Sequence, residues 1–380
     1  MIAVLRRRAL VLLVLTVVAC GLAGSWPQTT AATPALAART RPAGAPEVPT
    51  LRGTLPVPGL WTAWRDRFVT TDGRVVDDLG GGVSHSESQG YGLLLAVAAD
   101  DADTFRRIWK WTRGNLFLRK DGLASWRWQP GPAPNVRDPN NATDGDLLVA
   151  WALAEAGEAW NEPAFSLAAR HIARAIFAET VIETRFGPTL LPAVTGFRAA
   201  ERKDGPVVNP SYWVFPAFAR LERMMPDLDW AGVAQTGERI VVEASAGPTG
   251  LPPEWASLAG DRVKPAEGFP PVFGYNAVRV PLHLAWAGGF RRERLAPYMA
   301  RWSTPEGGAP KMHVVDVERG QNLEPFSDRG YRAIAALVAC ELEGTRFPDD
   351  LRGTDVDHYF PSTLRALALV AVNTRHPTCW

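Results

Sequence analysis

The sequence predicts an all-helical fold, a toroid of paired helices with a few short strands. From Leu60 onward, apolar residues recur almost throughout at the spacing of amphipathic helices, which gives about eleven or twelve helices. Strand signals are few and short, around residues 189–191 and 313–317. No self-similar period runs through the chain, which argues against a solenoid. The 380 residues, 46% of them hydrophobic, suffice for one large domain with a sizeable core.

The predicted helices follow one another with short extended pieces between them. Leu60, Trp64 and Phe68 have the i, i+4, i+8 spacing of one apolar helix face. Residues 71–75 read as a turn into a short extended piece, and residues 125–129 read as extended and aromatic. Helices are predicted at residues 60–68, 86–99, 103–116, 147–160, 164–181, 211–225, 228–244, 276–287, 292–301, 328–343 and 362–372.

The N-terminus has the features of an export signal. Three arginines at residues 6–8 precede an apolar stretch at residues 9–19, and residues 35–37 offer a small-residue cleavage site. The apolar stretch is too short for a comfortable transmembrane helix, so we expect no stable membrane insertion. Cys20 offers an alternative, a lipoprotein processing site with a lipid anchor.

These features divide the chain into three parts. We expect a signal peptide at residues 1–37, a flexible spacer rich in Ala, Pro and Thr at residues 38–55, and one folded domain at residues 56–380. The expected location is periplasmic or secreted. We expect a monomer.

Charge and motif content exclude several function classes. The formal net charge is +1, from 41 basic and 40 acidic residues, so nucleic acid is not an expected partner. Six histidines without paired spacing argue against a metal site. No phosphate loop or dinucleotide fingerprint occurs, and we read the run Gly80-Gly81-Gly82 as a loop. No cofactor is therefore expected.

Two residue types leave alternatives open. Cys340 and Cys379 either pair in an oxidising compartment or remain separate thiols. The fifteen tryptophans fill the core or form flat apolar platforms for sugar rings, and we expect some of them to line a groove.

The stretch from Ser84 to Ala96 begins polar and becomes a continuous apolar run, which predicts the start of a buried helix. Ser84 or Ser86 is a suitable cap, because a hydroxyl accepts from the free N–H groups of a first turn. Glycines 90 and 92 each cost roughly 1 kcal/mol in a helix relative to alanine. We expect them to give room for close approach by a backbone or a ligand, and Glu87 to lie at the helix mouth.

A second helix start carries Asp144 and Asp146. In a helical toroid, such starts converge at one end. Glycoside hydrolysis needs two carboxyl groups, one protonated to donate to the leaving oxygen and one ionised. The helix dipole favours the anion, so Glu87 needs burial or a carboxylate neighbour to stay protonated. Asp146 taken alone reads as a helix cap.

Four segments of the chain resemble segments of a known enzyme family. Ser86-Glu87-Ser88-Gln89-Gly90-Tyr91-Gly92-Leu93 resembles the Ser-Glu-Gly-Gln-Gly-Tyr-Gly-Met segment of glycoside hydrolase family 8, and residues 142–151 resemble the second signature of that family. Residues 209–212 and 275–281 resemble two further segments, in the right order. Within that family, the chain resembles the cellulases encoded with bacterial cellulose synthases.

The resemblance implies an (α/α)6 barrel and an inverting endo-β-1,4-glucanase that acts on a β-1,4-glucan chain, with a cellulose synthase complex as a potential partner. It implies that Glu87 is the general acid and that Asp144 is a catalytic carboxylate that binds and distorts the central sugar. Tyr212 and Arg279 would lie beside the attacking water. The residues expected to bind substrate are Tyr91, Trp126, Trp128, Asp146, Tyr212, Trp213, Asn276 and Arg279.

The chain departs from the family pattern where it matters for the base. Many members have Asp at the position of Asn276, and that Asp is the proposed base. An amide cannot accept a proton at neutral pH. The sequence leaves Asp144, Glu324 and Asp328 open as substitutes. It also leaves open a non-catalytic glucan-binding accessory, or a hydrolase of another polymer such as xylan, with chitosan the least expected.

Overall fold

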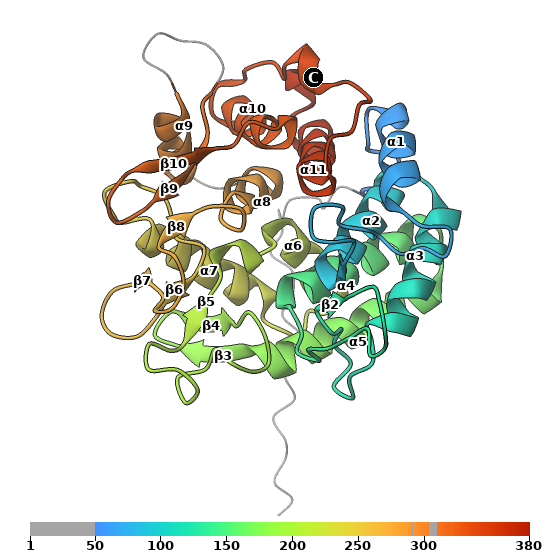
Figure 1. Cartoon of the computed structure of the whole chain (residues 1–380), viewed down its shortest axis with the longest axis horizontal. Coiled ribbons are helices and arrows are strands. Elements are labelled where there is room, and N and C mark those ends of the chain that lie inside the picture. Colours follow the sequence, from blue (N-terminus) through green and yellow to red (C-terminus); the bar gives the residue numbers. More distant parts are fainter. Residues whose placement is uncertain (1–49, 290–291, 304–309) are drawn as a thin grey trace, which may run out of the picture. The chain divides into compact units, whose positions relative to one another are not determined.

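The computed structural model describes residues 50–289, 292–303 and 310–380 (Figure 1). The predicted signal peptide at residues 1–37 and the candidate lipidation site Cys20 lie outside the described residues. Within the described part, no helix is both long enough and apolar enough to cross a membrane.

The described chain is mainly helical, as predicted. The α-helices are α1 (Pro58–Phe68), α2 (Ser86–Ala98), α3 (Ala102–Asn115), α4 (Thr143–Ala159), α5 (Pro163–Thr180), α6 (Phe215–Met224), α7 (Trp230–Ala244), α8 (Arg279–Ala287), α9 (Ala296–Trp302), α10 (Arg329–Glu343) and α11 (Tyr359–Arg375). Four short 3-10 helices are η1 (Pro210–Tyr212), η2 (Arg292–Arg294), η3 (Asp349–Leu351) and η4 (Pro377–Cys379).

Two predicted helices are each split in the structure. The helix expected at residues 211–225 is η1 followed by α6, and the helix expected at 292–301 is η2 followed by α9. Proline stands in the first turn of both α6 and α9. Proline suits a first helical turn but has no N–H to continue a helix from the preceding turn, so each helix restarts there.

The strands are short. They are β1 (Ser84–His85), β2 (Arg127–Trp128), β3 (Val181–Thr184), β4 (Gly187–Leu190), β5 (Val207–Val208), β6 (Ala256–Ser257), β7 (Lys264–Pro265), β8 (Val272–Phe273), β9 (His313–Asp316) and β10 (Asn322–Pro325). They pair antiparallel in four small sheets, β1-β2, β3-β4, β5-β6-β7 and β10-β9-β8. The predicted strand signals at 189–191 and 313–317 correspond to β4 and β9.

Six helices form an inner ring. Helix α2 contacts α4, α4 contacts α6, α6 contacts α8, α8 contacts α10, α10 contacts α11, and α11 contacts α2, which closes the ring. The remaining helices pack outside this ring, with α1 against α2 and α11, α3 against α2, α5 against α4, α7 against α6 and α9 against α10 (Figure 1). This is the predicted toroid of paired helices.

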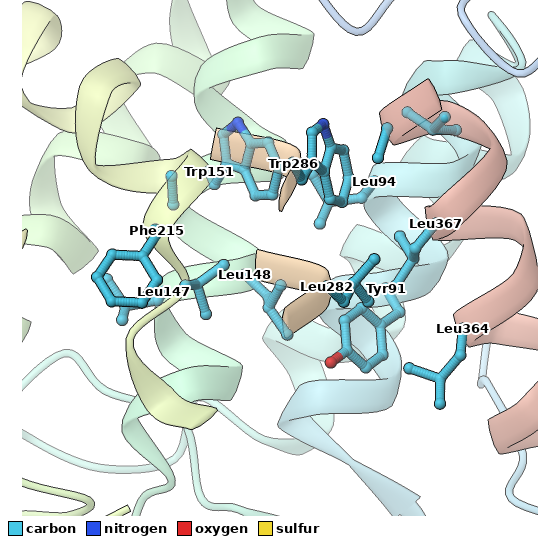
Figure 2. Close-up of a cluster of buried hydrophobic side chains, with 14 of the residues drawn as sticks. Tyr91, Leu94, Leu147, Leu148, Trp151, Phe215, Leu282, Trp286, Leu364 and Leu367 are labelled. Atoms are coloured by element: carbon cyan, nitrogen blue, oxygen red, sulfur yellow. The ribbon is translucent and has the colours of Figure 1, made fainter. Parts of the chain in front are cut away.

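Apolar side chains of the inner helices fill the centre of the ring. Figure 2 shows Tyr91, Leu148, Trp151 and Leu282 among the side chains that meet there. The ring centroids of Trp151 and Trp286 are 5.0 Å apart. Buried aromatic residues dominate core energetics because each removes a large apolar area from water. Most described tryptophans serve this purpose, since eight are buried: Trp61, Trp64, Trp111, Trp151, Trp213, Trp230, Trp286 and Trp302.

Glycine allows α2 and α4 to pack at very short range. A Cβ on Gly90 would lie 2.5 Å from Cβ of Leu148, and a Cβ on Gly145 would lie 2.1 Å from the hydroxyl of Ser86. A Cβ on Gly92 would meet Val75 at 2.7 Å. The glycines of α2 therefore make room for neighbouring segments of the protein. Of the two predicted causes of close approach, the structure shows a neighbouring protein segment at both glycines and not a ligand.

The fold begins before the predicted boundary at residue 56. Leu51 and Leu55 are buried, and the backbone N–H of Leu55 donates to the carbonyl oxygen of Ala98 at 2.8 Å. The N–H of Leu51 donates to the carboxylate of Glu155, which also forms a buried ion pair with Arg220. The spacer thus ends earlier than predicted, because apolar burial and hydrogen bonds anchor residues 51–55 to the helical ring.

A disulfide joins Cys340, near the end of α10, to Cys379 in η4. Of the two alternatives that the sequence left open, the structure has the pair. Closing a loop with a sequence separation of 39 restricts the unfolded chain, which corresponds to about 4 kcal/mol in the chain-entropy description.

We expect Cys379→Ser to lower the free energy of unfolding by about 2–4 kcal/mol, because the unfolded chain regains that freedom. Urea unfolding of oxidised protein measures the difference. Adding reductant should lower the free energy of unfolding of the wild type to that of Cys379→Ser. It should leave the free energy of unfolding of Cys379→Ser unchanged. An unchanged unfolding midpoint in the variant would show that the crosslink contributes nothing.

Candidate active site

The start of α2 presents Glu87 to the cleft. His85 is the N-cap, and the hydroxyl of Ser88 accepts from the N–H of His85 at 2.9 Å and donates to its carbonyl oxygen at 2.8 Å. The predicted caps are therefore wrong. Ser84 donates instead to the carbonyl oxygen of Val75 at 2.6 Å, and Ser86 is the first helical residue. Glu87 lies in the first turn, with its side chain 23% exposed.

Arg279 at the start of α8 joins the two predicted catalytic carboxylates. One of its terminal nitrogens, Nη1, donates to Glu87 and, at 2.8 Å, to Asp144. Its other terminal nitrogen, Nη2, donates to the hydroxyl of Ser211 and to the side-chain oxygen of Asn276, each at 2.9 Å. Three inner helices thus contribute to one hydrogen-bonded cluster, and residues far apart in the sequence meet at its centre.

The cluster holds two carboxyl groups and one cation in a buried position. The Asp144 side chain is 2% exposed and that of Arg279 is 3% exposed. Burial raises the pKa of Asp144 to about 7, the negative charge of Glu87 adds to that rise, and Arg279 opposes it. The pair therefore retains a proton near neutral pH, as a proton donor in catalysis requires.

The cluster opens into a cavity of about 220 Å³. Its lining residues come from the loop before α2 and from the starts of the inner helices or the segments just before them. They are Asp77, His85, Ser86, Glu87, Trp126, Ala142, Asp144, Tyr212, Asn276, Tyr359 and Phe360. Polar groups converge here beside aromatic rings, as in sites that bind small molecules or sugars.

Tyr212 and Trp126 occupy positions on the cavity wall. The guanidinium carbon of Arg279 lies 5.7 Å from the ring centroid of Tyr212. Trp126 stacks on His85, with ring centroids 5.9 Å apart, and its indole N–H donates to Asp138 at 2.9 Å. Burial lowers the pKa of His85, so this imidazole is neutral at pH 7.

Two of the predicted sugar platforms lie elsewhere. Trp213 is fully buried, and its indole N–H donates to the carbonyl oxygen of Val233 at 3.0 Å. It has no exposed face, so the role predicted for it does not fit its position. Trp128 is not among the cavity-lining residues, and it lies against Trp111 and the guanidinium of Arg74.

Asp146 and Tyr91 are also below the cavity surface. Asp146 is fully buried and accepts from the N–H of Ala124 at 2.8 Å and from the side chain of Asn141 at 3.0 Å. It fastens the segment before β2 to α4. The reading of Asp146 as a helix cap is wrong, because the N-cap of α4 is Ala142 and has no side-chain cap, and the burial of Asp146 does not fit substrate binding either. Tyr91 is fully buried in the helical core and does not line the cavity.

Asn276 lines the cavity, and its side-chain oxygen already accepts two hydrogen bonds from the protein. Its side-chain oxygen accepts from Arg279 and, at 3.4 Å, from the side chain of Asn209, and its backbone N–H donates to Glu254 at 2.7 Å. Neither Glu324 nor Asp328, the loop acids considered as alternative bases, lines the cavity.

Six cavity-lining residues were not among the predicted site residues: Asp77, His85, Ser86, Ala142, Tyr359 and Phe360. Asp77 precedes a glycine run that reads as an ordinary loop, and Tyr359 and Phe360 open a helix whose start was predicted at residue 362. No group of His, Cys, Asp and Glu in the described residues has the arrangement of a metal site.

Comparisons with known proteins match this chain over most of its length. A family model described as "Glycosyl hydrolases family 8" matches residues 52–374. A probable endoglucanase of Novacetimonas hansenii is 36% identical over 290 residues, which cover 75% of this chain and 82% of the relative. The structure of the endo-beta-1,4-glucanase CMCax from Acetobacter xylinum matches with a TM-score of 0.77 at 33% identity, covering 84% of this chain and 99% of that one. The crystal structure of endoglucanase Cel10 from Klebsiella pneumoniae matches with a TM-score of 0.73 at 30% identity, covering 83% and 99%.

Replacing Arg279 should make stability depend steeply on pH. Without the cation, the buried carboxyl group of Asp144 prefers the neutral form more strongly. Its pKa in the folded protein then lies further above its unfolded value, and the folded protein loses stability as pH rises. We expect Arg279→Met to cost little near pH 4.5 and about 3–5 kcal/mol near pH 8.

Urea unfolding between pH 4.5 and 8.5 measures this dependence. Arg106→Met is the matched control, because the ion pair of Arg106 with Glu162 is exposed and should contribute less than about 1 kcal/mol at every pH. Equal pH profiles for the two variants would contradict the role of Arg279 in compensating the carboxylate pair.

Proposed function

Because the chain belongs to glycosyl hydrolase family 8, with the (α/α)6 toroid of its relatives, we propose that it is an endo-β-1,4-glucanase that hydrolyses internal bonds of cellulose or a related β-glucan. The observation that carries the proposal is the cluster in which Arg279 binds both Glu87 and Asp144, two carboxyl groups that line the cavity. The relatives named above support the substrate class. A non-catalytic glucan-binding role is less well supported, because the carboxylate pair is complete.

Glu87 is the proposed general acid. It is the more exposed member of the carboxyl pair, so it can reach the glycosidic oxygen while Asp144 stays buried beneath it. The proton that the pair retains moves from Glu87 to the leaving oxygen as the C–O bond breaks. Asp144 remains beside Arg279, where it can bind a hydroxyl of the central sugar and stabilise positive charge on its ring.

Inversion requires a water that attacks the anomeric carbon from the face opposite the acid, with acid and base about 6.5–9.5 Å apart. Tyr212 and Asn276 line the cavity with Glu87 and are the proposed neighbours of that water. The amide of Asn276 can hold the water by a hydrogen bond, but it cannot take its proton. Trp126 is the proposed sugar platform on the cavity wall.

We further propose export, with residues 1–37 as the signal peptide. The disulfide between Cys340 and Cys379 supports an oxidising compartment, since cytosolic thiols are usually kept reduced. The proposed location is therefore periplasmic or extracellular. Association with a cellulose synthase complex and a monomeric state remain predictions from the sequence.

We expect the wild type to release reducing ends from carboxymethylcellulose and Glu87→Gln to lose about 10²- to 10⁴-fold in kcat, because the amide cannot donate a proton as a carboxylic acid does. Glu162→Gln, which alters an exposed carboxylate, is the matched control and should keep full activity. Wild-type turnover by Glu87→Gln would refute the assignment of the acid.

Asn276→Asp should raise kcat by about tenfold or more. A carboxylate at this position would lie beside Arg279, which favours its ionised form, and could accept the proton of the attacking water. Initial rates on cellohexaose compare the variant with the wild type, and Asn276→Ala serves as the control that removes the amide without adding a base. An unchanged or lower kcat in Asn276→Asp would show that the water loses its proton elsewhere.

A further inference from the structure

Two adjacent carboxylates in the loop before α2 have different surroundings. Asp78 accepts from the backbone N–H of Tyr359 at 2.9 Å and lies 3.1 Å from Nδ1 of His358. It also accepts from Arg67 at 3.3 Å. All these contacts are internal, and they tie the loop to the start of α11. Asp78 is therefore a structural residue.

Asp77 faces the cavity that contains Glu87. One carboxylate oxygen, Oδ1, accepts from the N–H groups of Leu79 at 3.1 Å and Gly80 at 2.9 Å. The backbone N–H of Asp77 donates to the carbonyl oxygen of Val83 at 2.9 Å. These bonds hold the side chain in one orientation without help from a ligand. The other oxygen, Oδ2, has no hydrogen-bond or ion-pair partner among the described residues.

The neighbours of Asp77 on the cavity wall supply no cation. They are the neutral imidazole of His85 and the rings of Tyr359 and Phe360. Arg279 does not line the cavity, and its guanidinium is already shared by two carboxyl groups. An oriented carboxylate oxygen without a cation takes hydrogen bonds from neutral donors, and sugar hydroxyls are the donors that a glucan brings into the cavity.

We propose that Asp77 is a substrate-binding residue whose Oδ2 accepts a hydrogen bond from a hydroxyl of a glucosyl unit beside Glu87. The proposal deepens the function proposed above and rests on it for the identity of the ligand. Asp77 positions the sugar and takes no part in proton transfer. The adjacent Asp78 keeps the loop in place, so Asp77 is assigned to substrate binding and Asp78 to the structure of the loop.

Asn is the matched replacement, because its side-chain oxygen can still accept from Leu79 and Gly80 while an NH₂ group replaces the second acceptor. Affinity for cellohexaose, measured by calorimetry in a Glu87→Gln background that cannot turn the ligand over, should fall about tenfold in Asp77→Asn, since a hydrogen bond to a charged group is roughly twice as strong as a neutral one. The melting temperature should stay within about 2 °C of the parent. Asp77→Ser, whose hydroxyl also supports such a turn, should weaken binding by about tenfold or more.

Asp78→Asn is the control for loop disorder and should lower the melting temperature while leaving the affinity unchanged. Parental affinity in both Asp77 variants would overturn the proposal and leave Asp77 as a loop cap. An equal loss of affinity in Asp78→Asn would also overturn it, because any loosening of the loop would then suffice. These outcomes are independent of turnover. If the wild type cleaved no β-glucan, the proposed function would fail, while cellohexaose binding would still test the role of Asp77.

Discussion

The close packing of the α2 start on the α4 start is the constraint on which the site depends. Gly145 leaves space for the hydroxyl of Ser86, and Gly90 leaves space for Leu148, so the two helices approach more closely than larger residues would allow. Because the first turns lie against each other, Glu87 and Asp144 accept from the same nitrogen, Nη1 of Arg279. A larger residue at Gly145 would separate the two helix starts and with them the carboxyl pair. The close packing at these two glycines therefore determines that the two carboxyl groups of the site lie next to each other.

The electrostatics of the cluster follow from that packing. Two carboxyl groups at helix starts are favoured as anions by the helix dipoles, yet burial and mutual repulsion favour a neutral partner. One arginine cannot compensate two adjacent anions fully, so one proton remains with the pair. The carboxylate neighbour of Glu87 is Asp144, and burial raises the pKa of Asp144 to about 7.

The order and type of the elements were predictable because apolar periodicity reflects which face each helix buries, and the convergence of Glu87 with Asp144 followed from two polar helix starts in a toroid. Side-chain accessibility was less predictable. Trp213 and Trp126 are the same residue type, and the tertiary packing determines that one is buried against Val233 while the other lines the cavity. Asp77 was missed because its significance lies in an unpartnered oxygen beside a helix start, which local sequence does not reveal.

Asn276 illustrates a balance between stability and chemistry. With one proton on the carboxyl pair, the charges of Glu87, Asp144 and Arg279 sum to zero, and the neutral amide of Asn276 completes the hydrogen bonds of Arg279 without adding charge. An aspartate there would supply a base but would bring one more anion into a buried cluster that already holds two carboxyl groups, at a cost in folding free energy. Active sites commonly trade stability for activity in this way. The chain has the amide, so the interaction that best satisfies Arg279 also removes the most direct route for the proton of the attacking water.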